Sequence, residues 1–110
     1  MNTDLLINKI QVASVLLKAL SNEKRLHITC ALLEGEKAVG TLEQLVGLSQ
    51  SALSQHLARL RRDKIVKTRR SAQTIYYSIA DPAAEKVVHA LCEVLCSDEE
   101  CANTNLEEVS

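Results

Sequence analysis

The sequence predicts a mainly α-helical fold with one small β-hairpin, in the order helix, helix, helix, helix, strand, strand, helix. Apolar residues recur at helical spacing in most of the chain, and only between Ile65 and Ile79 does the period change from 3.6 to 2. With 110 residues, 46% hydrophobic and 25% charged, the composition fits one ordinary globular domain. We expect a domain over residues 1–97, followed by an acidic, disordered tail over 98–110.

The first two helices are predicted from apolar spacing and from polar residues that cap helix N-termini. The first covers Leu5 to Leu20, with Thr3 or Asp4 as its N-cap. Ser21 is expected to cap a second helix from Asn22 to Leu33. One face of this second helix is predicted to carry Leu26, Cys30 and Leu33.

Two shorter helices follow, separated by a turn around Gly47. The pattern Thr41-Leu42-Glu43-Gln44 is a capping box, which predicts a short third helix ending at Gly47. Ser49 is expected to cap a fourth helix that runs to about Arg62. Its buried stripe is predicted to consist of Leu53, Leu57 and Leu60.

The alternating segment predicts two strands, Ile65 to Arg70 and Thr74 to Ile79, joined at Ser71-Ala72-Gln73. Asp81 followed by Pro82 is typical of a helix start, because aspartate caps well and proline fits the first helical position. The last helix is therefore expected to run to about Cys96.

Charge is distributed unevenly along a chain whose formal net charge is only −1. Residues 50–80 carry seven Lys or Arg and one acid, whereas residues 81–110 carry one Lys and eight acids. A basic segment of this kind is either a solvated helix face or the footprint of a polyanionic partner.

The turn, the fourth helix and the basic hairpin together predict a winged helix-turn-helix that binds DNA. Serine and glutamine can bond to base edges, and arginines suit phosphates. The chain has no Phe or Trp on which bases could stack, so duplex DNA is favoured over RNA or single strands. The expected DNA-binding residues are Gln50, Ser51, Ser54, Gln55, Arg59, Arg62, Arg69 and Arg70.

Other functional classes receive little support from the sequence. No apolar run approaches the ~18–20 residues that span a bilayer, and the N-terminus has no signal core, so we expect a cytoplasmic protein without a membrane partner. The four cysteines are expected to be thiols in reducing cytosol. We expect no catalytic activity and no cofactor.

The stretches ALSNEKRLHI, LSQSALSQHLARLRRD and AQTIYYSI resemble the ArsR/SmtB family of dimeric winged helix-turn-helix repressors, over residues 10 to 96. The resemblance implies a homodimer built from the first and last helices and a double-stranded, palindromic operator. It assigns DNA contacts to Gln50, Ser51, Ser54 and Gln55. Where related sequences have glycine after RRD, this chain has Lys64, which would be strained in left-handed backbone.

The resemblance also implies a chemical switch. Cys30 and Cys96 match the paired cysteines of the branch that contains BigR, SqrR and HlyU, which senses reactive sulfur species. A persulfide on one thiol, attacked by the other, would leave a disulfide or polysulfide bridge between two helices. The expected function is therefore a repressor whose inducer is a reactive sulfur species, although Cys30 alone is also compatible with a small core residue.

Two alternatives stay open at this point. One is a metal-responsive repressor of the same fold, in which His89, Cys92 and Cys96 of the last helix would bind Zn²⁺ or Cu⁺. The other, from a different class, is a small dithiol redox or metal-buffering protein, although the chain lacks a Cys-x-x-Cys motif. The sequence leaves the operator, the regulated genes and a role for Cys101 open.

Overall fold

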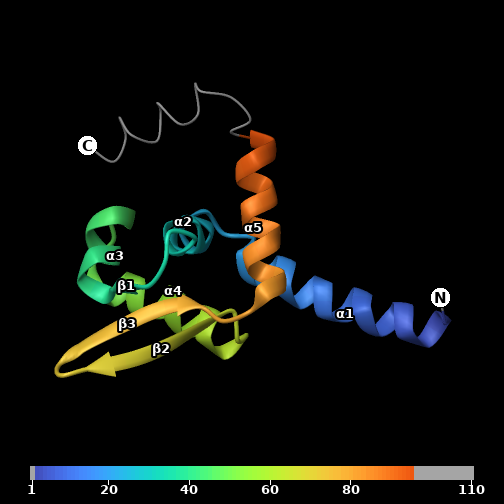
Figure 1. Cartoon of the computed structure of the whole chain (residues 1–110), viewed down its shortest axis with the longest axis horizontal. Coiled ribbons are helices and arrows are strands. Elements are labelled where there is room, and N and C mark those ends of the chain that lie inside the picture. Colours follow the sequence, from blue (N-terminus) through green and yellow to red (C-terminus); the bar gives the residue numbers. More distant parts are fainter. Residues whose placement is uncertain (1, 96–110) are drawn as a thin grey trace.

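The computed structural model describes residues 2–95, so the expectations for Cys96, Cys101 and the tail lie outside the described residues. Five helices and a three-stranded antiparallel sheet follow one another in the predicted order, with one additional short strand (Figure 1). The elements are α1 (Thr3–Leu20), α2 (Glu23–Leu32), β1 (Lys37–Ala38), α3 (Val39–Val46), α4 (Gln50–Arg62), β2 (Val66–Ser71), β3 (Thr74–Ile79) and α5 (Pro82–Leu95). The predicted fold class is confirmed.

Asparagines cap the first two helices. The side chain of Asn2 accepts a hydrogen bond from the Asp4 N–H at 2.8 Å, so neither predicted residue, Thr3 or Asp4, is the N-cap. The Asn22 side chain accepts hydrogen bonds from the N–H groups of Lys24 and Arg25 in the first turn of α2. Ser21, predicted as this cap, instead terminates α1. In both cases the prediction missed the cap by one or two residues, because Asn, Ser, Thr and Asp cap helices almost equally well.

The start of α3 differs from the prediction. The helix begins at Val39, two residues before the capping box predicted at Thr41, and its N-cap Ala38 makes no side-chain hydrogen bond. The preceding residues form β1, in which Ala38 lies opposite Tyr76 of β3. The sheet order is therefore β1-β3-β2. A two-residue strand leaves no period-2 pattern in the sequence, so only its pairing with a distant strand reveals it.

The hairpin has a shorter turn than the three residues predicted. Ser71 pairs with Thr74, so only Ala72 and Gln73 connect β2 to β3. Ala72 has φ 56°, and positive φ at the first central residue is a feature of the primed turns that join two-residue hairpins. The start of α5 is as predicted, with the Asp81 carboxylate accepting from the Ala83 N–H at 2.9 Å.

Lys64, between α4 and β2, adopts the left-handed conformation that the sequence indicated as a source of strain, with φ 61°. Replacing Lys64 by glycine should raise the free energy of unfolding by about 1 kcal/mol, because glycine adopts positive φ without steric cost. Urea denaturation followed by circular dichroism measures this change. Lys67→Gly removes the same charge from extended strand backbone and should destabilise the protein, so equal effects of the two substitutions would contradict the explanation.

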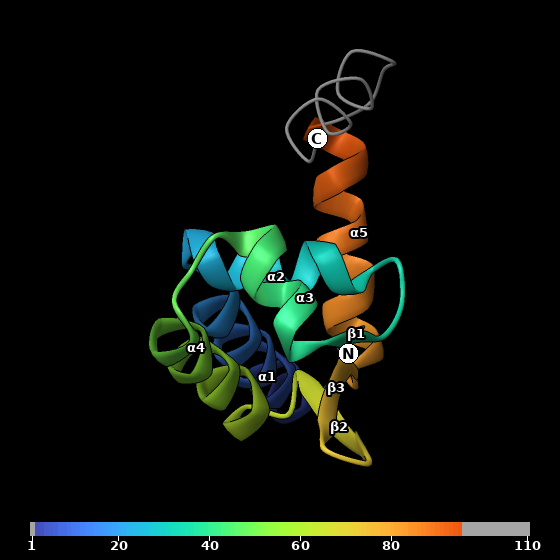
Figure 2. The same cartoon turned by 90° about the vertical axis from the view of Figure 1, so that its left-hand side faces the viewer.

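The core is formed where α2 packs against α3, α4 and α5 (Figures 1 and 2). The predicted stripe of α4 is buried as expected. On α2 the fully buried residues are Ile28, Thr29 and Leu32, and the predicted residues Leu26, Cys30 and Leu33 are half-buried and pack against the same core. The remaining buried apolar residues are Leu16, Ala19, Leu20, Leu42, Val46, Ile65, Val66, Ala84 and Val88.

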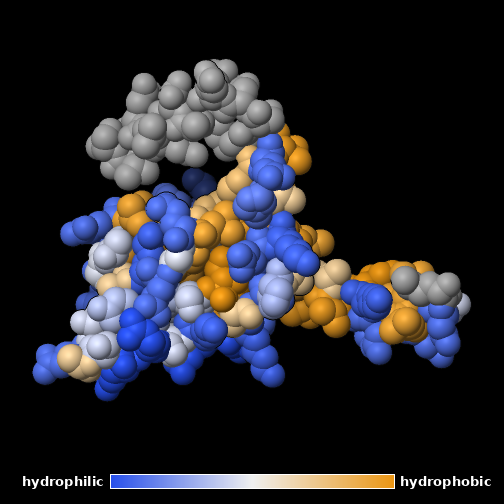
Figure 3. All heavy atoms as spheres, viewed as in Figure 1, coloured by the Kyte–Doolittle hydropathy of each residue, from blue (hydrophilic) through white to orange (hydrophobic). Residues whose placement is uncertain are grey.

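Exposed apolar side chains gather on α1 and α5. The N-terminal part of α1 extends away from the other elements (Figure 1), and hydrophobic side chains cover much of it (Figure 3). The large exposed apolar residues are Leu5, Leu6, Ile7, Ile10, Val12, Val15, Leu17, Leu91, Val94 and Leu95. No helix within residues 2–95 combines the length and apolar character that crossing a bilayer requires.

Candidate nucleic-acid interface

Helix α4 presents a polar face to solvent and buries its opposite face. Ser49 caps it as predicted, its hydroxyl accepting from the Ala52 N–H at 3.2 Å. The buried leucine stripe fixes the rotation of the helix about its axis. As a result, the four predicted base-reading residues are all exposed: Gln50, Ser51, Ser54 and Gln55.

A tight turn sets the angle between α3 and α4. Gly47 ends α3 in left-handed conformation, with φ 73°, and its N–H donates to the carbonyl of Glu43 at 2.9 Å. Only two residues, Leu48 and Ser49, then precede α4. This is the geometry of a helix-turn-helix, in which the second helix is free to enter a major groove.

The hairpin of β2 and β3 forms a wing beside α4. In both views, α4 and the hairpin lie away from the end of α5 (Figures 1 and 2). At this wing Arg70 is exposed, but Arg69 is paired: it donates from Nε and Nη2 to the two carboxylate oxygens of Glu36, at 2.9 and 2.6 Å. The Arg69 guanidinium also lies 4.5 Å from the ring centroid of Tyr76. The sequence did not indicate this pairing.

The pair between Arg69 and Glu36 keeps both groups charged. The hydrogen bonds from Arg69 lower the pKa of the Glu36 carboxyl, and the same bonds raise the pKa of Arg69. Because Glu36 is an anion beside the wing, it both occupies the guanidinium and repels phosphate.

We therefore predict that Glu36→Gln strengthens binding to random duplex DNA two- to fivefold and steepens its salt dependence, because Arg69 becomes available to phosphates. Fluorescence anisotropy across a salt series measures both quantities. Glu34→Gln is the matched control, because it removes a nearby negative charge, paired with Lys37 at 3.9 Å, and leaves Arg69 bound to Glu36. Equal effects of the two variants would contradict a specific role of the Arg69 pair.

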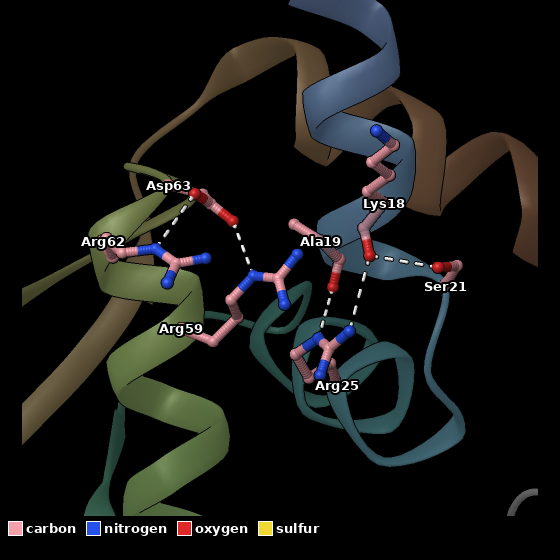
Figure 4. A network of polar contacts seen from close by, with 7 residues as sticks. All are labelled: Lys18, Ala19, Ser21, Arg25, Arg59, Arg62 and Asp63. Atoms are coloured by element: carbon pink, nitrogen blue, oxygen red, sulfur yellow. Dashed lines mark hydrogen bonds and ion pairs between the residues drawn. The ribbon is translucent and has the colours of Figure 1, made fainter.

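Arg59, predicted as a phosphate contact, is also paired in the structure. Its Nε donates to Asp63 at 3.0 Å, and the Nε of Arg62 lies 3.5 Å from the other carboxylate oxygen (Figure 4). The side chain of Arg62 is 68% exposed, against 35% for Arg59. Arg62 is therefore the more accessible of the two, and the DNA contacts of both arginines remain predictions.

Arg25 connects α2 to the end of α1. Its Nε donates to the Ala19 carbonyl at 2.6 Å and its Nη2 to the Lys18 carbonyl at 3.4 Å (Figure 4). The first bond satisfies a carbonyl group near the end of α1, where helical partners are missing, whereas the Lys18 carbonyl also accepts from the N–H and the hydroxyl of Ser21. Burial, followed by the charge of Arg59, lowers the pKa of Arg25. The contact thus fixes the end of α1 relative to α2.

A shallow hollow between α4 and β3 was not foreseen from the sequence. It is lined by Ser54, Ala58, Arg61, Arg62 and Tyr77. Two arginines, a hydroxyl and a phenol are suitable partners for a phosphate group. Tyr77 reaches this hollow because it pairs with Thr68 of β2, the strand that packs against α4, so no local pattern could have assigned it.

The thiol of Cys30 lies beside that of Cys92 rather than in apolar surroundings alone. The two Sγ atoms, from α2 and α5, are 3.8 Å apart. Burial raises the pKa of Cys30 to about 12, with further contributions from the charge and hydrogen bond of Cys92. The expected partner, Cys96, lies outside the described residues.

The metal-binding alternative finds no ligand set in the part of the chain that the structure describes. Within residues 2–95 no group of three His, Cys, Asp or Glu side chains is close enough to hold an ion. His89 is directed to Glu93, with Nδ1 3.6 Å from Oε1. The third residue of that alternative, Cys96, is outside this range.

These features define the class of protein: a winged helix-turn-helix with a polar, exposed recognition helix and a basic wing. Residues 22–68 match the family described as "Bacterial regulatory protein, arsR family". The transcriptional activator HlyU of Vibrio cholerae is 50% identical over 84 residues, which are 76% of this chain and 78% of HlyU.

Solved structures agree with this assignment. The transcriptional repressor BigR from Xylella fastidiosa superposes with a TM-score of 0.80 at 39% identity, covering 89% of this chain and all of the BigR chain. A homodimeric winged helix-turn-helix DNA-binding domain from Mycobacterium bovis gives a TM-score of 0.72 at 28% identity, covering 89% and 90% of the two chains. The chain belongs to the arsR family of bacterial regulatory proteins. It is a transcriptional regulator and not an enzyme, which sets aside the redox-protein alternative.

Proposed function

We propose that this regulator is a homodimeric repressor that binds a palindromic operator and releases it when reactive sulfur species modify its cysteines. The observation that carries the DNA-binding part is the exposed face of α4, whose Gln and Ser side chains are free to reach base edges. Arg61 and Arg62 end α4, Arg70 lies in β2 of the wing, and all three are exposed. They supply the positive charge that phosphate contacts need.

The proposed dimer is formed through α1 and α5. Val12 on α1 is 69% exposed and Leu95 on α5 is 76% exposed, which is unusual for large apolar residues at helix surfaces that face water. A second copy that covers both helices would bury these side chains. Two-fold symmetry would then place two α4 helices about 34–36 Å apart, one turn of the duplex.

The proposed switch uses the position of Cys30. Its helix, α2, packs against α5, which also carries part of the proposed dimer surface. A sulfur bridge from Cys30 to Cys96, which follows α5 in sequence, would constrain α5 relative to α2. Because α5 also contributes to the dimer surface, the distance between the two recognition helices would change and the operator would no longer fit.

One experiment tests both parts of the proposal. The reduced protein selects its operator from a pool of random duplexes, and affinity is then measured for reduced and polysulfide-treated protein. We expect treatment to weaken operator binding at least tenfold and dithiothreitol to restore it. The variant in which all four cysteines are replaced by serine should bind the operator with an affinity that polysulfide treatment does not change. A treated wild type with unchanged affinity would overturn the switch, and failure to select any sequence would overturn operator recognition.

A further inference from the structure

The sequence suggested Cys92 only as a ligand of the metal-binding alternative, and the structure places this cysteine beside Cys30. The two residues are separated by 62 positions in the chain, and their sulfurs are in contact at 3.8 Å. Both side chains are half-buried, so solvent and small reagents reach the pair. Nothing has to unfold or move far for the two sulfurs to react with each other.

We propose that Cys92 is a sulfur-reactive thiol that forms a covalent bridge to Cys30 and thereby ties α5 to α2. The bridge is a disulfide or contains one additional sulfur atom. The formation of this bond is independent of the repressor function, whereas its effect on DNA binding rests on the function proposed above. Cys92 therefore competes with Cys96 for the single thiol of Cys30.

The geometry admits both kinds of bridge. A disulfide requires the sulfurs to approach to about 2.05 Å, whereas two successive S–S bonds span about 3.3 Å between the outer sulfurs. The observed 3.8 Å is closer to the second value. A side-chain rotation or a small approach of α5 to α2 is enough to bring the sulfurs to disulfide distance. The longer bridge thus needs the smaller change.

The order of events follows from the surroundings of the two thiols. Burial and the neighbouring sulfur raise the pKa of Cys30 to about 12, against an ordinary value of 9.0, so Cys30 stays protonated near neutral pH. The thiolate is the nucleophile in sulfur exchange, which makes Cys30 a slow first attacker. Cys30 also packs against the hydrophobic core, whereas Cys92 lies between two exposed residues of α5, so we assign the first reaction with the donor to Cys92.

The chemistry is complete with a polysulfide as the only oxidant. The Cys92 thiolate attacks a sulfane sulfur, a new S–S bond forms, and the shortened polysulfide leaves with the electrons of the broken bond. Cys30 then loses its proton to water and attacks the Cys92 sulfur, which forms the disulfide and expels hydrosulfide. If Cys92 carries two added sulfurs, attack on the inner added sulfur leaves the three-sulfur bridge and again expels hydrosulfide. In either case two thiols are oxidised and one sulfane sulfur is reduced to sulfide.

The test isolates each cysteine pair in the full chain. The variant Cys96→Ser with Cys101→Ser retains only Cys30 and Cys92, and Cys92→Ser with Cys101→Ser retains only Cys30 and Cys96. Each reduced variant is treated with inorganic polysulfide, alkylated, digested and analysed by mass spectrometry. Circular dichroism of each variant before treatment shows whether it is folded.

We expect the Cys30–Cys92 variant to give a monomeric crosslink of the two cysteine peptides, with one or no additional sulfur atom, which dithiothreitol reverses. Adding Cys30→Ser should leave Cys92 persulfidated and uncrosslinked within the chain. In brief labelling of the untreated variant at neutral pH, iodoacetamide should modify Cys92 before Cys30. A folded variant in which both cysteines remain separately alkylated after treatment would overturn the proposal.

Operator affinity measured on the same samples separates this proposal from the function on which it depends. A Cys30–Cys92 crosslink that leaves affinity unchanged would contradict the assigned effect on DNA and leave the bond established. The wild type could instead lose affinity through a Cys30–Cys96 bridge, with no Cys30–Cys92 product in the wild type or in the Cys30–Cys92 variant. That result would leave the repressor function standing and overturn the role of Cys92.

Discussion

Replacing Gln55 by alanine should weaken binding to the selected operator by about 30-fold or more. A bidentate contact between glutamine and a base contributes about 1–3 kcal/mol, and a symmetric dimer loses one such contact in each half-site. Gln55 is exposed on α4, opposite the buried leucine stripe, so its removal leaves the fold intact. Fluorescence anisotropy with the operator duplex, at fixed salt concentration, measures the loss.

Two controls make this result specific to base recognition. Binding to a scrambled duplex should change less than twofold, because phosphate contacts are independent of sequence. Gln44→Ala, the same substitution at an exposed position of α3 outside the proposed dimer surface, should leave operator affinity unchanged. An equal loss on operator and scrambled DNA would show that Gln55 does not read bases.

Replacing Ile10 by aspartate should separate the proposed dimer and lower operator affinity at least 100-fold. Ile10 is 57% exposed on α1, and the proposed partner would cover it, so a carboxylate there would have to be buried without a partner. A monomer reads only one half-site and loses the gain in effective concentration that links the two, which is about 10²–10⁴. Analytical ultracentrifugation gives the oligomeric state, and anisotropy gives the affinity.

The matched control is Gln44→Asp, which adds a negative charge at an exposed position of α3, outside the proposed interface. It should remain dimeric at the concentration where Ile10→Asp is monomeric. Circular dichroism of Ile10→Asp should still show a helical protein, because the side chain lies outside the core of the protomer. A dimeric Ile10→Asp variant would contradict the assignment of α1 to the interface.

Most of the recognition helix could be predicted because its determinants are close together in the chain. The hydroxyl of Ser49 reaches an N–H three residues later, and Gly47 supplies the left-handed residue that ends α3. The stripe of Leu53, Leu57 and Leu60 then settles which side chains face solvent. The N-caps of the first two helices were not predicted, because several neighbouring residues cap equally well. In the structure these N-caps are Asn2 and Asn22.

Features that depend on residues far apart could not be predicted. The strand Lys37–Ala38 exists only through its pairing with β3. Arg69 is of a residue type that commonly binds phosphate, yet its guanidinium is bound to the carboxylate of Glu36, 33 positions earlier. The cysteine that lies beside Cys30 is Cys92, because the packing of α2 on α5 decides which turn of α5 faces it.

The sequence by itself determined the order of the elements other than β1, the rotation of α4 and the concentration of positive charge on one segment. Each of these depends on hydrogen bonds and periodicity within a few residues. The tertiary structure decided which charges are already paired, which thiols meet and which apolar faces of α1 and α5 stay uncovered in the protomer. These outcomes depend on how helices and strands pack, since contacts between residues 33 and 62 positions apart leave no local pattern in the chain.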